Sequence, residues 1–305
     1  MRLSIVTPAF NEGGNLEALH VRISEVMATA GLEWEWIVID DHSRDDTFDV
    51  VRRLSAADRR VAGLRLARNS GSHTAISCGL HHVTGDAAVV LAADLQDPPE
   101  VLPTLVDEWR KGAQVVWAVR RIRHGESTGK LGFSRLYWAM MRGPVGLSEL
   151  PARGADLFLI DRRVIDAFRS MTEQPVSVFA LITWMGFRQV SVDYDKQPRS
   201  SGRSGWSVQK KLALVVDSVT GFSDFPIRWC AYAGVGLIVL APPVALFARS
   251  LVALLLALAG LQLLAIGVVG EYVWRGVQEA RQRPAFLIEA VAGVLSPNPA
   301  ERAHR

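Results

Sequence analysis

The sequence has very little cysteine and no large excess of charge of either sign. Its 305 residues include two cysteines, Cys78 and Cys230, which are far apart, and the second lies in an apolar segment. Neither a disulfide framework nor a zinc site is therefore indicated, and a reducing compartment fits. The 34 Lys and Arg residues nearly balance the 31 Asp and Glu residues, for a net charge of +3 at pH 7. This mild charge argues against a nucleic acid partner and is compatible with anionic lipids and phosphorylated substrates.

Two N-terminal patterns are also absent. The short apolar segment Leu3–Val6 lacks the long apolar core and small-residue cleavage site of a signal peptide, so none is expected. No Gly-x-Gly-x-x-Gly pattern follows it, which disfavours an ordinary dinucleotide-binding fold. Hydrophobic residues, by contrast, make up 49% of the chain, and at this length they predict one large domain with a membrane segment.

Short apolar segments alternate with amphipathic ones over residues 2–120. This alternation predicts an α/β fold with a mostly parallel sheet and helices on its faces. The predicted strands are Leu3–Thr7, Trp34–Ile39, Gly63–Ala67, Ala87–Ala92 and Gln114–Val119.

The segment that follows the fourth predicted strand carries the strongest chemical signal. Asp94 and Gln96 are expected at the carboxyl end of that strand, where open α/β sheets bind ligands. Their carboxylate and amide oxygens suit a hard divalent cation, Mg²⁺ or Mn²⁺. Asp97, Pro98 and Glu100 then predict a capped helix start. The alternative is that Asp94 only forms a turn or a cap.

The whole segment Asp-Leu-Gln-Asp-Pro-Pro-Glu, after an apolar strand, resembles the metal-binding segment of family-2 glycosyltransferases. The resemblance is to the polyprenyl-phosphate branch, typified by dolichol-phosphate mannose synthase and bactoprenol-phosphate glucosyltransferase. It implies a nucleotide-diphospho-sugar transferase domain of the GT-A type, with Asp94 and Gln96 as metal ligands. The family usually has a second Asp two residues earlier, and here that position is Ala92.

The resemblance also implies a donor site. The first strand end resembles the family's Pro-x-Tyr-Asn-Glu, with Phe10 in place of Tyr, and the second resembles its Asp-Asp-Gly-Ser turn, with His42 in place of Gly. Residues 199–206 match its Arg-x-x-Gly-x-Ser-x-aromatic loop, which closes over the donor diphosphate. Taken alone, these are a turn, a helix start and a flexible loop. The implied donor-binding residues are Pro8, Ala9, Asn11, Glu12, Asp41, Asp94, Gln96, Arg199, Arg203, Ser204 and Trp206.

Further positions are implied for catalysis and for the acceptor. Asp156 lies in a segment similar to the family's Gly-x-Asp-Phe-x-Leu motif and is expected, with Asp94 and Arg203, to be catalytic, although a structural ion pair is the alternative for Asp156. The cations expected near the acceptor phosphate are Arg120, Lys130 and Arg135. The histidines at 73, 81 and 82 lack metal-ligand partners at suitable spacing, and we interpret them as helix-surface residues.

Two apolar segments, Trp229–Ala248 and Leu251–Trp274, are each long enough to cross a bilayer and are separated only by a short turn. Lys and Arg flank the pair, whereas the turn carries only Arg249, so the positive-inside rule places both ends in the cytoplasm. A soluble helical hairpin is the alternative. The expected division is a cytoplasmic glycosyltransferase domain at 1–207, interfacial amphipathic helices at 208–228, a two-helix transmembrane hairpin at 229–275 and a cytoplasmic tail at 276–305.

The resemblance therefore implies an inner-membrane enzyme that transfers a sugar, with inversion at the anomeric carbon, from a nucleotide-diphosphate sugar to undecaprenyl or decaprenyl phosphate. A UDP-glucose-like donor is preferred, and the product would serve cell-envelope glycosylation. Assembly into a homo-oligomer is left open. Two alternatives remain. One is a processive polysaccharide synthase, whose Gln-x-x-Arg-Trp motif is missing because no Gln precedes Arg228-Trp229 at that spacing. The other is a non-catalytic membrane-bound nucleotide-sugar-binding protein, suggested by Ala92.

Overall fold

The computed structural model describes residues 1–121, 151, 155, 157–171, 177–197, 230, 232, 251–280 and 283–295. The chain divides into two compact units. The first contains Met1–Trp138, Glu149–Gly205 and Pro284–Arg305, and the second contains Ala139–Ser148 and Trp206–Arg283. Seven of the predicted site residues lie outside the described ranges: Lys130, Arg135, Asp156, Arg199, Arg203, Ser204 and Trp206.

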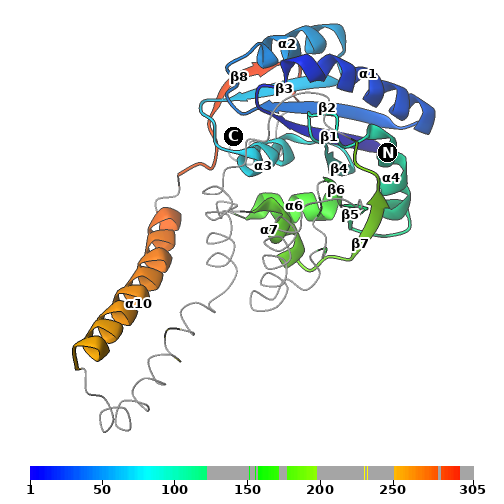
Figure 1. The fold of residues 1–305 in the computed structure, drawn as a ribbon. Helices are drawn as coiled ribbons and strands as arrows, with labels where there is room; N and C mark the ends of the chain where they lie inside the picture. The colour runs from blue at the N-terminus through cyan, green and yellow to red at the C-terminus, as the bar shows by residue number, and fades with distance from the viewer. Residues whose placement is uncertain are drawn as a thin grey trace. The chain divides into compact units, whose positions relative to one another are not determined.

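Within the described part of the first unit, eight strands form one sheet in the order β7-β5-β6-β4-β1-β2-β3-β8 (Figure 1). The strands are β1 (Arg2–Ala9), β2 (Glu33–Asp40), β3 (Val61–Leu66), β4 (Ala87–Val90), β5 (Val115–Arg120), β6 (Leu157–Asp161), β7 (Gln189–Tyr194) and β8 (Ile288–Ala292). The strands from β1 to β5, together with β7, run in one direction, whereas β6 and β8 are antiparallel to their neighbours. The five predicted strands and the α/β fold class are confirmed, and the sheet is mixed.

Helices cover both faces of this sheet (Figure 1). One face packs against α1 (Gly13–Ala30), α2 (Thr47–Ala57) and α4 (Leu102–Arg110), and the other is covered by α3 (Ser72–His82), α6 (Arg162–Ser170) and α7 (Val178–Trp184). In α1 the buried apolar side chains recur every three or four residues, as an amphipathic helix requires. That helix ends at Gly31, whose left-handed backbone lets its N–H bond the carbonyl oxygen of Ala28.

The predicted helix cap after β4 is wrong. A single 3-10 turn, η1 (Pro99–Val101), precedes α4, and no side chain caps it. The carboxylate of Asp97 is instead buried, where it accepts a 2.5 Å hydrogen bond from the hydroxyl of Tyr194 and lies 3.3 Å from Nζ of Lys196. A long-range contact to the end of β7 therefore replaces the local cap that the sequence favoured.

The second apolar segment predicted from the sequence lies in a single helix, α10 (Leu251–Ala280). At a rise of about 1.5 Å per residue, a helix of this length extends about 45 Å. Among the residues that the structure describes, no helix is both long and apolar enough to cross a membrane. The first segment of the predicted hairpin and the predicted amphipathic helices lie outside the described ranges apart from Cys230 and Tyr232, so the hairpin at 229–275 is not confirmed.

Candidate functional site

The carboxyl ends of β1, β2, β3 and β4 lie along one edge of the sheet, because these neighbouring strands are parallel. The register pairs Ala9 with Asp40 and Val6 with Val90. The loops that follow the four strands therefore meet at this edge, where open α/β sheets bind ligands. Among the predicted donor residues, Pro8, Ala9, Asn11, Glu12, Asp41, Asp94 and Gln96 all belong to these loops or strand ends.

Three residues in these loops have a left-handed backbone. In the described part of the chain, the non-glycine residues with positive φ are Asn11 (58°), His42 (62°) and Leu95 (59°). Such a conformation is uncommon outside glycine, although Asn and His adopt it more often than Leu does, and it persists where the surroundings determine it. At Asn11 the surroundings are polar, since its N–H donates to Oγ of Ser43 at 2.9 Å and its side-chain oxygen accepts from the N–H of Arg44 at 2.8 Å. This cluster of unusual backbone marks the edge as the candidate site.

Asp41 connects the end of β2 to the turn before α3. Its side chain is only 4% exposed, and its two oxygens accept from the N–H groups of Ser70 at 2.7 Å and Gly71 at 2.8 Å. Burial raises the pKa of Asp41, although these two hydrogen bonds oppose the rise. A carboxylate has about four acceptor positions, so Asp41 keeps capacity for a ligand. Its observed contacts show a carboxylate that shapes the turn.

The loop after β1 is fixed in the same way. The N–H of Glu12 donates to Oγ1 of Thr47 at 2.9 Å, and its carboxylate accepts from the side-chain amide of Asn15 at 2.6 Å. Pro8 is half-buried and Ala9 is buried. The two strand ends and the start of α2 therefore form one hydrogen-bonded unit.

The segment after β4 contains the predicted metal ligands. Asp94 and Gln96 are both half-buried, and one oxygen of Asp94 accepts from the N–H of Gln96 at 3.1 Å. The carbonyl oxygen of Gln96 accepts from the N–H of Gln197 at 2.8 Å. The structure thus places Gln197, two residues before Arg199 in the sequence, directly beside the Asp94 segment. Arg120 is the exposed last residue of β5 and pairs in register with Tyr194 at the same edge.

Among the described residues, the groups near Asp94 suit a divalent cation that a bound ligand helps to hold. In the described ranges there is no cluster of three or more His, Cys, Asp or Glu side chains suited to a metal ion. Asp94 supplies one carboxylate and Gln96 one amide oxygen, whereas Ala92 supplies none and Asp97 is engaged by Tyr194 and Lys196. Mg²⁺-type sites commonly use one or two carboxylates with substrate phosphates and water. The donor set is therefore compatible with a cation bound together with a diphosphate.

The sequence interpretation of His73, His81 and His82 as helix-surface residues is only partly correct, because all three lie in α3 but are half-buried. His73 is half-buried, its Nδ1 accepts from the N–H of Val178 at 3.4 Å, and burial lowers its pKa to about 4. His81 packs edge-on against Phe168 and Phe286, and burial lowers its pKa as well. Both side chains join α3 to other elements, which the sequence near them does not reveal.

Residues that the sequence analysis missed hold the turn after β2. The carboxylate of Asp40 is fully buried, where it accepts a 2.6 Å hydrogen bond from Nη1 of Arg65 and another from the N–H of Ser43 at 2.8 Å. Nη2 of Arg65 also donates to the carbonyl oxygen of Ser43 at 3.0 Å. The available signal was an Arg within an otherwise apolar strand, next to a strand that ends in two acidic residues.

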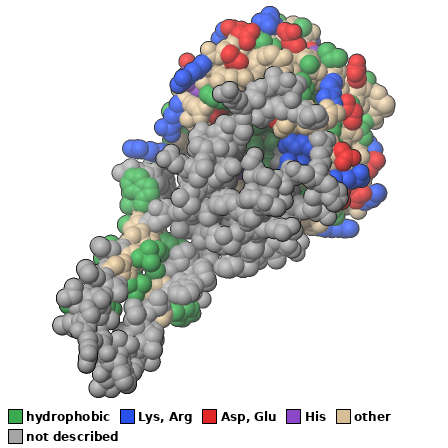
Figure 2. Space-filling view, viewed as in Figure 1, with side chains coloured by type: hydrophobic (Ala, Val, Ile, Leu, Met, Phe, Trp, Pro, Cys, Tyr) green, Lys and Arg blue, Asp and Glu red, His purple; other side chains and the backbone are tan. Residues whose placement is uncertain are grey.

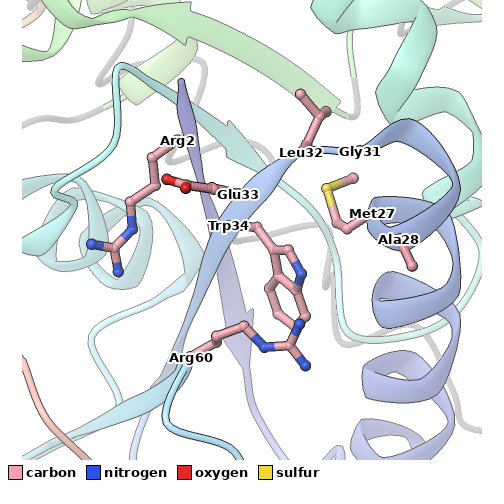
Figure 3. A pocket seen from close by; sticks show the side chains of 8 residues that line it. All are labelled: Arg2, Met27, Ala28, Gly31, Leu32, Glu33, Trp34 and Arg60. Atoms are coloured by element: carbon pink, nitrogen blue, oxygen red, sulfur yellow. The ribbon is translucent and has the colours of Figure 1, made fainter.

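A pocket of about 540 Å³ lies at the opposite edge, near the amino ends of β1 and β2 (Figure 3). Its lining includes Trp34, Arg2 and Arg60. The guanidinium of Arg60 lies 4.2 Å from the Trp34 ring centre and bonds Asp58, while that of Arg2 bonds Glu35 at 2.9 Å. Because both cations are used by the protein itself, this pocket is a weaker candidate than the edge with the four loops.

Comparison with known proteins identifies relatives of this chain. The profile of glycosyl transferase family 2 matches residues 4–168. An uncharacterized glycosyltransferase of Synechocystis is 33% identical over 96% of both chains. A bactoprenol glucosyl transferase of Shigella phage SfX is 31% identical over 95% of this chain and 99% of that protein.

Solved structures share the fold. Mannosyl-3-phosphoglycerate synthase from Rubrobacter xylanophilus superposes with a TM-score of 0.52 at 18% identity, covering 77% of this chain and 75% of that one. Glucosyl-3-phosphoglycerate synthase from Mycobacterium tuberculosis, in complex with Mn²⁺, UDP and phosphoglyceric acid, superposes with a TM-score of 0.50 at 20% identity. This superposition covers 72% of this chain and 76% of that one. The GT-A-like fold expected from the sequence is thereby confirmed. Because the family profile covers more than half of the chain and relatives match nearly all of it, this protein belongs to glycosyltransferase family 2.

Proposed function

We propose that this protein transfers a sugar from a nucleotide-diphosphate sugar to a polyprenyl phosphate. The observation that carries the proposal is the match to bactoprenol glucosyl transferases, which covers 95% of the chain. That match extends far beyond residue 168, where the family profile ends, and includes the C-terminal apolar segments. The similarity to this lipid-phosphate branch therefore concerns the whole chain. We propose a UDP-glucose-like donor and undecaprenyl or decaprenyl phosphate as acceptor, and the name bactoprenol glucosyl transferase, carried by these relatives, supports a glucosyl group and a polyprenol acceptor.

The donor is proposed to bind along the edge formed by the loops after β1, β2 and β4. Asp41 and Glu12 would accept hydrogen bonds from the nucleoside, and Asp94 with Gln96 would hold Mg²⁺ or Mn²⁺ beside the diphosphate. The bound cation offsets the negative charge that develops on the leaving diphosphate. The bond from Gln197 to Gln96 supports this arrangement, because the basic loop that contains Arg199 and Arg203 continues directly from Gln197.

The acceptor is proposed to react without a strong base. A phosphate monoester is largely ionised near neutral pH, so an acceptor oxygen can attack the anomeric carbon while the bond to the nucleoside diphosphate breaks on the opposite side. The anomeric configuration inverts and the diphosphate takes the electron pair. Positioning and electrostatics then supply most of the rate. The proposed positioning groups are Arg120, Lys130, Arg135 and Asp156.

A membrane location is proposed because the acceptor is a lipid. Apolar side chains line α10 (Figure 2), and several are exposed in the structure, including Leu264 at 62%, Ile266 at 66% and Val273 at 60%. Such a surface is costly in water and favourable against lipid. The distribution of Lys and Arg around the apolar segments supports a catalytic domain on the cytoplasmic side of the inner membrane.

The decisive experiment uses purified protein in detergent with undecaprenyl phosphate and a panel of labelled nucleotide sugars, in the presence of Mg²⁺, Mn²⁺ or a chelator. A labelled product that extracts into organic solvent and disappears with chelator is the expected result, and the productive donor names the sugar. If no donor gives a lipid product although a nucleotide sugar still binds, the non-catalytic alternative replaces this proposal. Polymeric product without lipid-linked monosaccharide would favour the processive synthase.

A further inference from the structure

The C-terminal strand β8 belongs to the same sheet as the candidate site. It pairs antiparallel with β3 at the end of the sheet, more than 220 residues later in the sequence (Figure 1). Its amino end lies at the edge where β3 ends, since Leu66 pairs with Ile288 and the N–H of Ala67 donates to the carbonyl oxygen of Leu287 at 2.9 Å. Residues of β8 therefore approach the loops that form the site.

The pairing contains an irregularity that singles out one residue. Arg65 pairs with Ala290, but Leu66 pairs with Ile288, so Glu289 is an extra residue in β8. An extra residue of this kind is a β-bulge, which bends the strand and redirects a side chain, often next to a functional site. The bulge brings the carboxylate of Glu289 to the turn after β2.

There Glu289 contacts both sides of that turn. Its carboxylate lies 3.0 Å from Nε of Arg65 and 3.4 Å from Nδ1 of His42, a nitrogen that also lies 3.1 Å from the carbonyl oxygen of Leu66. The same guanidinium bonds the buried carboxylate of Asp40 and the carbonyl oxygen of Ser43. Arg65 is thus held from two sides, by Asp40 from β2 and by Glu289 from β8.

His42 is the residue next to Asp41 and has the left-handed backbone of this turn. His42 lies in the turn after β2, and Arg65 bonds Asp40 and Ser43 of the same turn. A group that fixes both His42 and Arg65 therefore fixes this turn, and with it the position of Asp41. We propose that Glu289 is a positioning residue for the donor site, through which the C-terminal strand sets the affinity for the nucleoside diphosphate. This inference rests on the proposed function, because it assumes that the edge binds such a ligand.

Because the side chains of Arg65, His42 and Glu289 are all partly exposed, we expect their contact to adjust ligand affinity without determining the fold. The side chain of Arg65 is 21% exposed, that of His42 41% and that of Glu289 49%. Charge pairs with this exposure contribute little to overall stability. A change at Glu289 is therefore expected to alter ligand affinity more than folding, which separates a positioning role from a purely structural one.

The test compares Glu289→Gln with the unchanged protein in the full chain, in detergent with Mn²⁺. The dissociation constants of uridine diphosphate and guanosine diphosphate are measured by calorimetric titration. We expect Glu289→Gln to raise the dissociation constant of whichever nucleotide binds by about three- to fivefold, the size of a partly exposed charge pair expressed as a ratio. The kcat at saturating donor should change by less than about twofold, because uniform binding is lost. Glu289→Asp, which keeps the charge, should recover part of the affinity.

The matched control is Glu108→Gln. Glu108 also pairs with a cation, Nζ of Lys111 at 2.7 Å, but it lies near the end of α4, close to the amino end of β5 and thus at the opposite edge. It should leave nucleotide affinity unchanged. Unchanged nucleotide affinity in Glu289→Gln would overturn the positioning role, whether or not kcat and the unfolding temperature fall. If the protein without substitutions binds neither nucleotide, the proposed function is overturned, and this inference with it.

Discussion

Tyr194 and Asp97 join the end of β7 to the segment that contains Asp94 and Gln96. The carboxylate of Asp97 is 1% exposed, Tyr194 is 5% exposed, and the hydroxyl donates to the carboxylate at 2.5 Å. Tyr194→Phe keeps the ring and removes the hydroxyl that donates to this buried carboxylate. The expected cost is about 2 kcal/mol, since a hydrogen bond to a charged group contributes roughly 1.5–3 kcal/mol.

That cost has a measurable consequence. In a domain of this size, each kcal/mol lowers the unfolding temperature by about 2–4 °C, so Tyr194→Phe should lower it by about 4–8 °C in differential scanning calorimetry. The KM for the donor should rise as well, because the displaced Asp97 is adjacent to Gln96. Tyr232→Phe is the matched control, since Tyr232 is 68% exposed. An unfolding temperature within about 1 °C of the unchanged protein would refute the reasoning, because it would mean that the buried carboxylate does not need this donor.

Three further predictions concern the edge of the sheet. Asp94→Ala should lower the rate of lipid-linked product formation by about 100-fold or more, as loss of a metal ligand does, while the unfolding temperature stays nearly constant. A lower rate together with a clearly lower unfolding temperature would indicate a structural role instead. Ala92→Asp should strengthen Mn²⁺ binding in the presence of nucleotide, measured by titrating Mn²⁺ and recording the activity. Activity that appears only in this variant would identify a degraded site in the natural sequence. Asp41→Asn should change how stability depends on pH. Because burial raises the pKa of Asp41, its contribution to stability is fully present below the ordinary Asp pKa of about 4 and is lost as pH rises through the raised value. The stability of the natural protein relative to the Asn variant should therefore fall from about pH 4 upward in urea unfolding, and a rise over that range would contradict the assignment.

Local patterns were sufficient to predict β1 to β5 and the edge at which the candidate residues meet. Each of these strands is a compact apolar segment that ends in polar turn residues, so the signal lies within a few positions. The strand β8 carried no such signal, because Ile288–Ala292 acquires its partner from β3 across most of the chain. The cap at Asp97 failed for a similar reason, since Tyr194 and Lys196 compete for its carboxylate. Sequence reasoning fails where a distant partner outweighs a correct local preference.

The adjacent carboxylates of Asp40 and Asp41 explain how the edge is prepared for a ligand. Successive side chains point to opposite sides at the end of a strand, so the two residues can act on different neighbours. Asp40 bonds Arg65, which ties β2 to β3 and, through Glu289, to β8. Asp41 bonds the two N–H groups that precede α3. Both carboxylates are buried and bonded by protein groups, so the turn after β2 keeps its shape without a ligand. A donor that binds there meets a preorganised edge, and less of its binding energy is used to order the loops. For that reason, changes at Arg65 or Glu289 should reach the donor through the shape of this turn, although neither residue is proposed to touch it.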